Sequence, residues 1–302
     1  MRPTRLRPLL TLLTLSAALV SAMASAGAVA QSADTSVPAA VISDPPADAA
    51  HPAALAVLHI PSHGLRINGL VYQPSGAGPH PTLVILHGLP GNEKNLDLAQ
   101  AVRRDGWNAV TFNYRGSWGS PGSFRFAQTL EDADAVLAYL RLPANATRLG
   151  IDTHRIAIAG HSMGGWVAVQ TAAHDHALIG LILISSIDMG RVGAMPRDPR
   201  VALMADNMES LAGVTARSMA EDAAIHTKSL GFDSAVAGLR DLPLLGLTSD
   251  DGLAPDTDAL VQAITAAGGH HVTTLHVATD HGWSDHRIAL ESAVINWLNA
   301  LP

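Results

Sequence analysis

Apolar runs recur along the chain from residue 54 onward, each separated from the next by a polar or amphipathic stretch. The run at 82–86, Thr-Leu-Val-Ile-Leu, is continuous, as is typical of strands buried on both faces. Including this one, the runs that predict strands span residues 82–86, 107–112, 155–159, 178–184, 242–247 and 272–277. Two earlier runs, 54–60 and 65–72, flank the turn-like segment Pro61-Ser62-His63-Gly64 and predict a hairpin.

Helical patterns lie between the predicted strands. Residues 95–104, 127–141 and 163–173 have this character, and the apolar positions within 127–141 recur at helical spacing. Strands that alternate with helices of about 10–15 residues form crossover units in a parallel sheet. The order therefore predicts an α/β domain over residues 54–302. Its central sheet should be mostly parallel, with helices on both faces and the hairpin as an antiparallel edge.

The stretch 188–240 breaks this alternation. It contains five methionines among small and charged residues, and it follows the predicted strand 178–184. A small helical insertion at this point would be placed to form a cap over an active site. Packing helices on the outside of the sheet would explain the same pattern, since methionine fills irregular gaps in either setting. Both interpretations stay open.

The N-terminal 53 residues differ from the rest. Arg2, Arg5 and Arg7 precede an apolar run at 9–20 and a series of small residues, which is the layout of a secretory signal peptide. The run is too short to span a bilayer, which needs about 20 residues. We therefore predict that residues 1–30 direct export to the periplasm or the extracellular space, with cleavage after Ala26 or, preferably, Ala30. Residues 31–53 lack periodicity and predict a flexible leader. No other segment predicts a membrane span.

The net charge and the absence of cysteine exclude several classes of partner and chemistry. The net charge is −7, and because residues 1–30 carry three arginines and no acid, cleavage would leave −10. Such a surface repels phosphate backbones, so nucleic acid is not an expected partner. The chain has no cysteine, which excludes disulfides, a thiolate nucleophile and a thiolate-bound metal.

The segment 160–164 reads Gly-His-Ser-Met-Gly and matches the pattern G-x-S-x-G. It follows a predicted strand and opens a predicted helix, which is the context in which this pattern presents a nucleophilic serine on a strained turn. Gly160, Gly164 and Gly165 lack the bulk that would obstruct such a turn. Ser162 is therefore the predicted nucleophile.

A serine hydroxyl needs a general base, expected on a loop after the last strand. His281 lies in such a loop, after the predicted strand 272–277. Other histidines are close by, and a surface or metal-binding role for the group is the alternative interpretation; those neighbours are His270, His271, His276 and His286.

An acid that orients the base is expected one strand earlier. The loop after 242–247 offers Asp250 and Asp251. Asp251 is preferred because it lies four residues before Pro255. The chain order Ser162, Asp251, His281 is that of α/β-hydrolases.

The segment 87–91, His-Gly-Leu-Pro-Gly, follows the predicted strand 82–86 and is expected to form a tight loop near the nucleophile. Backbone N–H groups of such loops stabilise the oxyanion that forms during acyl transfer. Leu89 and Met163 are the predicted donors.

These elements together resemble the α/β-hydrolase superfamily over about residues 54–300. Two details are similar to the prolyl oligopeptidase-like branch: Asn113-Tyr114-Arg115-Gly116-Ser117-Trp118-Gly119, and His281-Gly282-Trp283. The resemblance implies that residues 113–117 brace the anion loop; contact of Arg115 with substrate is the alternative. Peptidases of that branch usually carry a β-propeller ahead of the catalytic domain, whereas only a short leader is seen here. The chain is therefore more similar to stand-alone esterase-like relatives.

The resulting hypothesis is a secreted serine hydrolase that cleaves carboxylic esters through an acyl-enzyme, with no cofactor and no metal. The substrate would be a small-molecule ester or a short peptide. The alternatives are a hydrolase of small peptides or aminoacyl amides using the same residues, and a non-catalytic binding protein of the same fold.

Overall fold

The computed structural model describes residues 30–225, 227 and 229–302. The predicted signal peptide, residues 1–30, lies almost wholly outside the described residues, and export stays a prediction. Among the described residues, no helix combines the length and apolar character that crossing a membrane requires.

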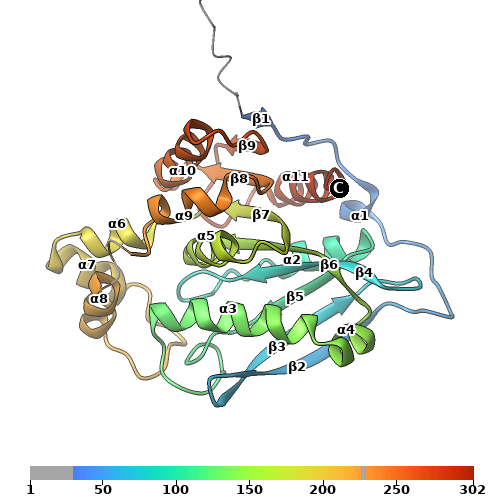
Figure 1. The fold of residues 1–302 in the computed structure, drawn as a ribbon, viewed down its shortest axis with the longest axis horizontal. Coiled ribbons are helices and arrows are strands. Elements are labelled where there is room, and N and C mark those ends of the chain that lie inside the picture. Colours follow the sequence, from blue (N-terminus) through green and yellow to red (C-terminus); the bar gives the residue numbers. More distant parts are fainter. Residues whose placement is uncertain (1–29, 226, 228) are drawn as a thin grey trace, which may run out of the picture.

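Over the described residues, one sheet of nine strands forms the centre of the molecule, in the order β1-β9-β8-β7-β6-β4-β5-β3-β2 (Figure 1). The first seven strands in this order, β1, β9, β8, β7, β6, β4 and β5, are parallel to one another. Strand β3 is antiparallel to both β5 and β2. The strands are β1 Gln31–Ser32, β2 Ala54–Ser62, β3 Leu65–Gln73, β4 His80–Leu86, β5 Asn108–Phe112, β6 Ile151–His161, β7 Leu178–Ile184, β8 Leu244–Ser249 and β9 Val272–Val277. The predicted α/β architecture, with a mostly parallel sheet and an antiparallel hairpin edge, is confirmed.

Burial explains why these segments are strands. All five residues of β5 are buried, as are residues 82–86 of β4, because helices cover both faces of the central sheet. The edge strand β2 instead alternates between exposed and buried positions over its second half, which matches a strand with one face in water.

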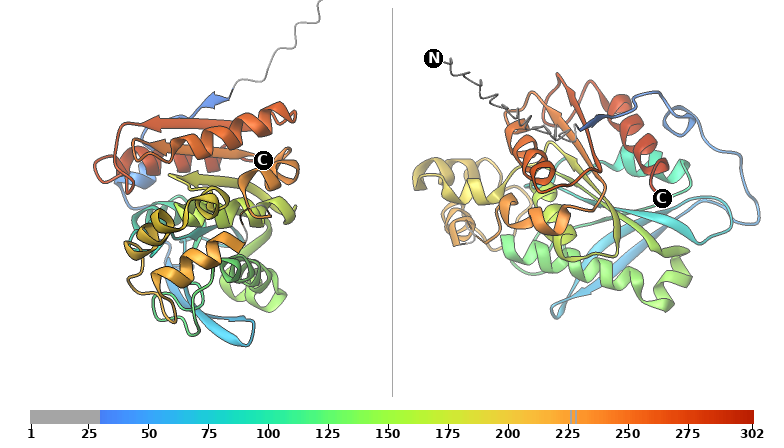
Figure 2. Two further views of the ribbon diagram at one scale, coloured as in Figure 1. Left: turned by 90° about the vertical axis from the view of Figure 1, so that its left-hand side faces the viewer. Right: turned by 45° about the horizontal axis from the view of Figure 1, so that its top comes forward.

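Helices lie on both faces of the sheet (Figure 2). One buried cluster joins the sheet to α3, α5, α9 and α10, and a second joins its opposite face to α1, α2 and α11. The helices are α1 Ala39–Ile42, α2 Leu96–Arg104, α3 Phe126–Arg141, α4 Pro143–Leu149, α5 Met163–His174, α6 Met189–Ala194, α7 Arg197–Ala205, α8 Ala216–Ile225, α9 Phe232–Leu239, α10 Ala254–Ala266 and α11 Arg287–Asn299.

Residues 31–53 differ from the flexible leader that their composition predicts. Strand β1 extends the sheet by pairing with β9, and the Arg104 guanidinium donates to the carbonyl oxygens of Ala40 and Val41 in α1. The amide of Asn296 donates to the carbonyl oxygens of Asp34 and Ser36. The segment contacts β9, Arg104 and Asn296 mainly through its backbone and contributes few apolar side chains. Its sequence therefore lacks hydrophobic periodicity.

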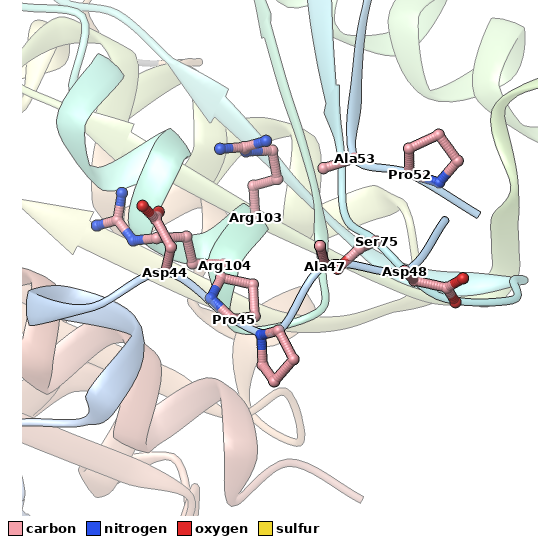
Figure 3. Close-up of a pocket in the computed structure, with 10 residues that line it drawn as sticks. Asp44, Pro45, Ala47, Asp48, Pro52, Ala53, Ser75, Arg103 and Arg104 are labelled. Atoms are coloured by element: carbon pink, nitrogen blue, oxygen red, sulfur yellow. The ribbon is translucent and has the colours of Figure 1, made fainter. Parts of the chain in front are cut away.

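The end of this segment forms one wall of a surface cavity of about 350 Å³, with Arg103 and Arg104 of α2 on the other side (Figure 3). None of the residues that line it belongs to the predicted site. The cavity therefore lies between the leader and α2, apart from the predicted site.

The stretch 188–240 is helical and divides into two parts. Helices α6, α7 and α8 lie together at one end of the molecule, on the left in Figure 1. Helix α9 packs against α5 so closely that a Cβ added to Gly238 would lie 2.0 Å from the carbonyl oxygen of Ala173. Only α6–α8 are therefore placed as a cap could be, whereas α9 is a packing helix of the sheet.

Candidate active site

Ser162 lies at the tight turn between β6 and α5. Its backbone has φ 56° and ψ −123°, a conformation that costs energy for a residue with a side chain. The turn packs closely, since a Cβ on Gly160 would lie 2.1 Å from the oxygen of Gly164, and one on Gly164 2.2 Å from the oxygen of Leu86. The glycines are therefore needed to hold Ser162 in this strained turn at the carboxyl end of β6.

His281 and Asp251 meet across two loops of the same sheet edge. The distance between His281 Nδ1 and Asp251 Oδ2 is 2.6 Å, and Asp251 Oδ1 accepts the N–H of Leu253 at 2.8 Å. Because a carboxylate only accepts, Nδ1 carries a proton, and in the neutral ring Nε2 of His281 is therefore the acceptor nitrogen. Burial acts to raise the pKa of Asp251, but the hydrogen bonds from His281 and Leu253 outweigh it and lower that pKa. Asp251 is therefore ionised at neutral pH.

The competing candidates lie elsewhere. Asp250 Oδ1 is 3.1 Å from His276 Nε2, and its side chain is 64% exposed, against 4% for Asp251. His286 pairs with the adjacent Asp285 at the surface. Among the candidate acids and bases, Asp251 and His281 contact each other, and both line the cavity that also contains Ser162.

The segment 87–91, the anion loop, passes directly over Ser162. A Cβ added to Gly88 would lie 2.8 Å from Cβ of Ser162 and 3.3 Å from its Oγ. Met163 is the first residue of α5, where a backbone N–H has no acceptor within its own helix. Leu89 and Met163 line the same cavity as Ser162. The two predicted oxyanion donors thus flank the nucleophile.

The segment after β5 supports the anion loop. Tyr114 Oη donates to the carbonyl oxygen of His87 at 3.3 Å, and Trp118 Nε1 donates to that of Pro90 at 2.7 Å. Ser117 Oγ lies 3.4 Å from Nε2 of His87. Burial lowers the pKa of His87 to about 4, so its ring is neutral, with Nδ1–H donating to the carbonyl oxygen of Gly88.

Arg115, from the same segment, points away from the cavity. It is buried and bonds to Asp132 at 2.6 Å, and it also pairs with Glu131. This geometry fits the bracing role and places Arg115 out of reach of a substrate at Ser162.

A cavity of about 240 Å³ opens beside Ser162, and its outer wall comes from α6 and α7. Most of the wall is apolar. Its lining residues are Leu89, Ser162, Met163, Ile187, Met189, Val192, Leu203, Met204, Asn207, Asp251, Leu253 and His281.

Two methionines of the stretch 188–240, Met189 and Met204, line the cavity. The sequence pattern did not identify the other lining residues Ile187, Val192, Leu203, Asn207 and Leu253. Helical spacing offered a partial signal, because Met189 and Val192 are three residues apart within α6. Nothing in the sequence showed which face of each helix would turn toward Ser162.

Over the part of the chain that the structure describes, no group of three or more His, Asp or Glu side chains is placed to share a metal ion. His276 and His286 each pair with an aspartate at the surface.

Residues 83–293 match the profile described as the alpha/beta hydrolase family. The "Quorum-quenching protein AidA" of Acinetobacter baumannii is 30% identical over 148 residues, 47% of this chain and 47% of that protein. The matches span about half the length of such curated relatives.

Solved structures of similar fold include hydrolases of two kinds. A carboxyl esterase from Bacillus coagulans superposes on 82% of this chain and 99% of its own, with a TM-score of 0.62 and 16% identity. An acylaminoacyl peptidase of Pyrococcus horikoshii covers 82% of this chain and 41% of its own, with a TM-score of 0.62 and 18% identity. At such identities the likeness is one of fold alone.

Proposed function

Because the chain belongs to the alpha/beta hydrolase family, we propose that it is a serine hydrolase that cleaves small carboxylic esters through an acyl-enzyme. The observation that carries the proposal is the 2.6 Å contact between His281 Nδ1 and Asp251 Oδ2, beside a cavity that also contains Ser162. A base held by a buried carboxylate next to a serine on a strained turn is the arrangement that activates a hydroxyl.

In the proposed reaction, Nε2 of His281 accepts the hydroxyl proton as Ser162 Oγ attacks the ester carbonyl carbon. Asp251 keeps the imidazole in the required tautomer and stabilises the imidazolium. The N–H groups of Leu89 and Met163 donate to the oxyanion of the tetrahedral intermediate. The C–O bond to the alcohol then breaks, and His281 returns its proton to the leaving oxygen. Water, deprotonated by His281, releases the carboxylic acid by the same steps.

The cavity lining favours an ester with an apolar acyl group. Asp251 is the one carboxylate among the lining residues, and its hydrogen bonds to His281 and Leu253 leave it unsuited to hold a substrate amino group. Met189, Val192 and Met204 present apolar surface to the cavity instead. Helices α6 and α7 thus serve as the cap in this proposal.

The test is labelling of the purified protein with a fluorophosphonate, together with turnover of p-nitrophenyl esters and aminoacyl p-nitroanilides. We expect labelling and ester turnover in the wild type and neither in Ser162→Ala. Ser234→Ala, which removes an exposed hydroxyl from α9, is the matched control and should behave as the wild type.

Faster turnover of the anilides than of the esters would replace the ester assignment with an amide hydrolase. A protein that neither reacts with the probe nor turns over any substrate would be a non-catalytic binding protein of this fold.

A further inference from the structure

The segment that carries His281 is held by donors on two successive backbone carbonyls. We call residues 278–286, between β9 and α11, the base loop. His161 Nε2 donates to the carbonyl oxygen of His281 at 2.9 Å, and Arg287 Nη1 donates to that of Gly282, also at 2.9 Å. Both donors bond to backbone carbonyl oxygens of the base loop, and neither lines the cavity beside Ser162.

Arg287 also reaches a second segment, far away in the sequence. Its Nε donates to Asp97 Oδ2 at 2.7 Å, and its Nη2 donates to Asp97 Oδ1 at 2.6 Å and to Asn95 Oδ1 at 3.0 Å. Asn95 and Asp97 lie at the start of α2, and residues 92–94 separate them from the end of the anion loop. One guanidinium therefore joins the segment that holds the base to the segment that follows the oxyanion donor Leu89.

The shape of this contact is specific to arginine. Four hydrogen bonds leave one planar group in two directions, toward the Asp97 carboxylate and toward the Gly282 carbonyl. A lysine ammonium offers a point charge without this fork and cannot reproduce both directions at once. Asn95, fully buried with φ 54°, fixes the far end of the contact.

The charges around Arg287 strengthen the fork. Burial acts to lower the pKa of Arg287, but the bonds and charge of Asp97, together with Glu93 and Glu291, outweigh it and raise that pKa. The guanidinium is therefore charged at neutral pH.

We propose that Arg287 is a positioning residue for the reaction, which sets the place of His281 relative to Ser162 and the oxyanion donors by tying the base loop to the start of α2. This rests on the proposed function. Alignment of a base to within a fraction of an ångström governs the chemical step, and a misplacement of about 1 Å costs about 100-fold in rate. Arg287 does not line the substrate cavity, so its loss should lower kcat and leave KM unchanged.

The experiment compares Arg287→Gln with Arg141→Gln. Arg141 is a matched control because it also pairs with an aspartate, Asp175, at 2.5 Å and is 26% exposed, against 20% for Arg287. We expect Arg287→Gln to lower kcat on p-nitrophenyl butyrate and the rate of fluorophosphonate labelling by about 10- to 100-fold, with KM within about twofold. Arg141→Gln should keep the wild-type kcat. Thermal unfolding of both variants separates loss of stability from loss of alignment.

Two further variants test the fork itself. Arg287→Lys should fold but recover little of the lost kcat, because a lysine cannot hold Asp97 and Gly282 together. Asp97→Asn should lower kcat in the same way, and combining it with Arg287→Gln should add little, since both changes disrupt one contact.

Wild-type kcat in Arg287→Gln, or in Asp97→Asn if Arg287→Gln does not fold, overturns the positioning role. So does a double variant whose effects multiply. A wild type that neither labels nor hydrolyses esters would instead overturn the proposed function, so the two failures are distinct.

Discussion

The adjacent residues Asp250 and Asp251 allow a test of the acid with a built-in control. Changing Asp251 to asparagine keeps the size of the side chain and removes its charge. The N–H of Leu253 donates to Oδ1 of Asp251 at 2.8 Å, so in the variant this N–H holds the amide oxygen in the same place. The amide NH₂ then faces His281 Nδ1, where the carboxylate oxygen was at 2.6 Å.

This swap reverses the tautomer of His281. An NH₂ group donates, so Nδ1 becomes the acceptor and the ring proton moves to Nε2, which can then no longer accept the proton of Ser162. Loss of the correct tautomer in a serine triad lowers kcat by about 10⁴-fold, or about 5 kcal/mol in the activation barrier. We expect a loss of this size in kcat on p-nitrophenyl acetate. The folded structure should persist, because the hydrogen bonds to Leu253 and His281 both retain a partner.

Asp250→Asn is the control. Its carboxylate is 64% exposed and pairs with His276 at the surface, where an ion pair contributes about 0–1 kcal/mol to stability. We expect kcat within about threefold of wild type. Circular dichroism and thermal unfolding verify that both variants fold. A larger loss in Asp250→Asn than in Asp251→Asn would refute the assignment of the acid and the tautomer argument with it.

Two other predictions concern the cap and the pH dependence of stability. Met204→Ala should enlarge the 240 Å³ cavity and raise kcat/KM for p-nitrophenyl octanoate relative to p-nitrophenyl acetate. Met208 does not line the cavity, so Met208→Ala should leave this ratio unchanged. Equal ratios in the two variants would contradict an acyl-binding cap. Burial and the charge of Asp97 raise the pKa of Glu291 to about 7, although Arg287 and Arg104 act to lower it. Between about pH 4.5 and pH 7 the folded protein therefore keeps a proton on Glu291 that the unfolded chain releases. The free energy of unfolding consequently falls as the pH rises through this range. At pH 8, Glu291→Gln should therefore raise the free energy of unfolding by up to about 3 kcal/mol, which thermal unfolding detects as a higher midpoint temperature, and near pH 4 it should have little effect. An equal shift of the midpoint at both pH values would contradict the raised pKa.

The strands, the helices and the turn at Ser162 follow from local patterns. A run such as 82–86 has no polar position, so it fits only the interior of a covered sheet, and β4 lies there with five consecutive residues buried. The G-x-S-x-G pattern between a strand and a helix likewise leaves little freedom, because the strained turn requires its glycines wherever the fold occurs. For the same reason, the order of the predicted strands was sufficient to indicate which loops meet at one edge of the sheet.

The pairing of polar side chains across that edge required the tertiary structure. Asp250 and Asp251 are neighbours in the chain, and only the direction of each side chain sends one to His276 and the other to His281. The offset from Pro255 favoured Asp251 but could not fix that direction.

Contacts between distant segments were also invisible in the sequence. Residues 31–53 have the composition of a flexible leader, yet β1 pairs with β9 through backbone groups that every residue carries. Arg287 contacts Asp97 across 190 residues, and no periodic pattern links them. Hydrophobic periodicity indicates which face of a segment is buried. Backbone pairing and single ion pairs depend instead on which surfaces the folded sheet brings together, and only the tertiary structure determines these contacts.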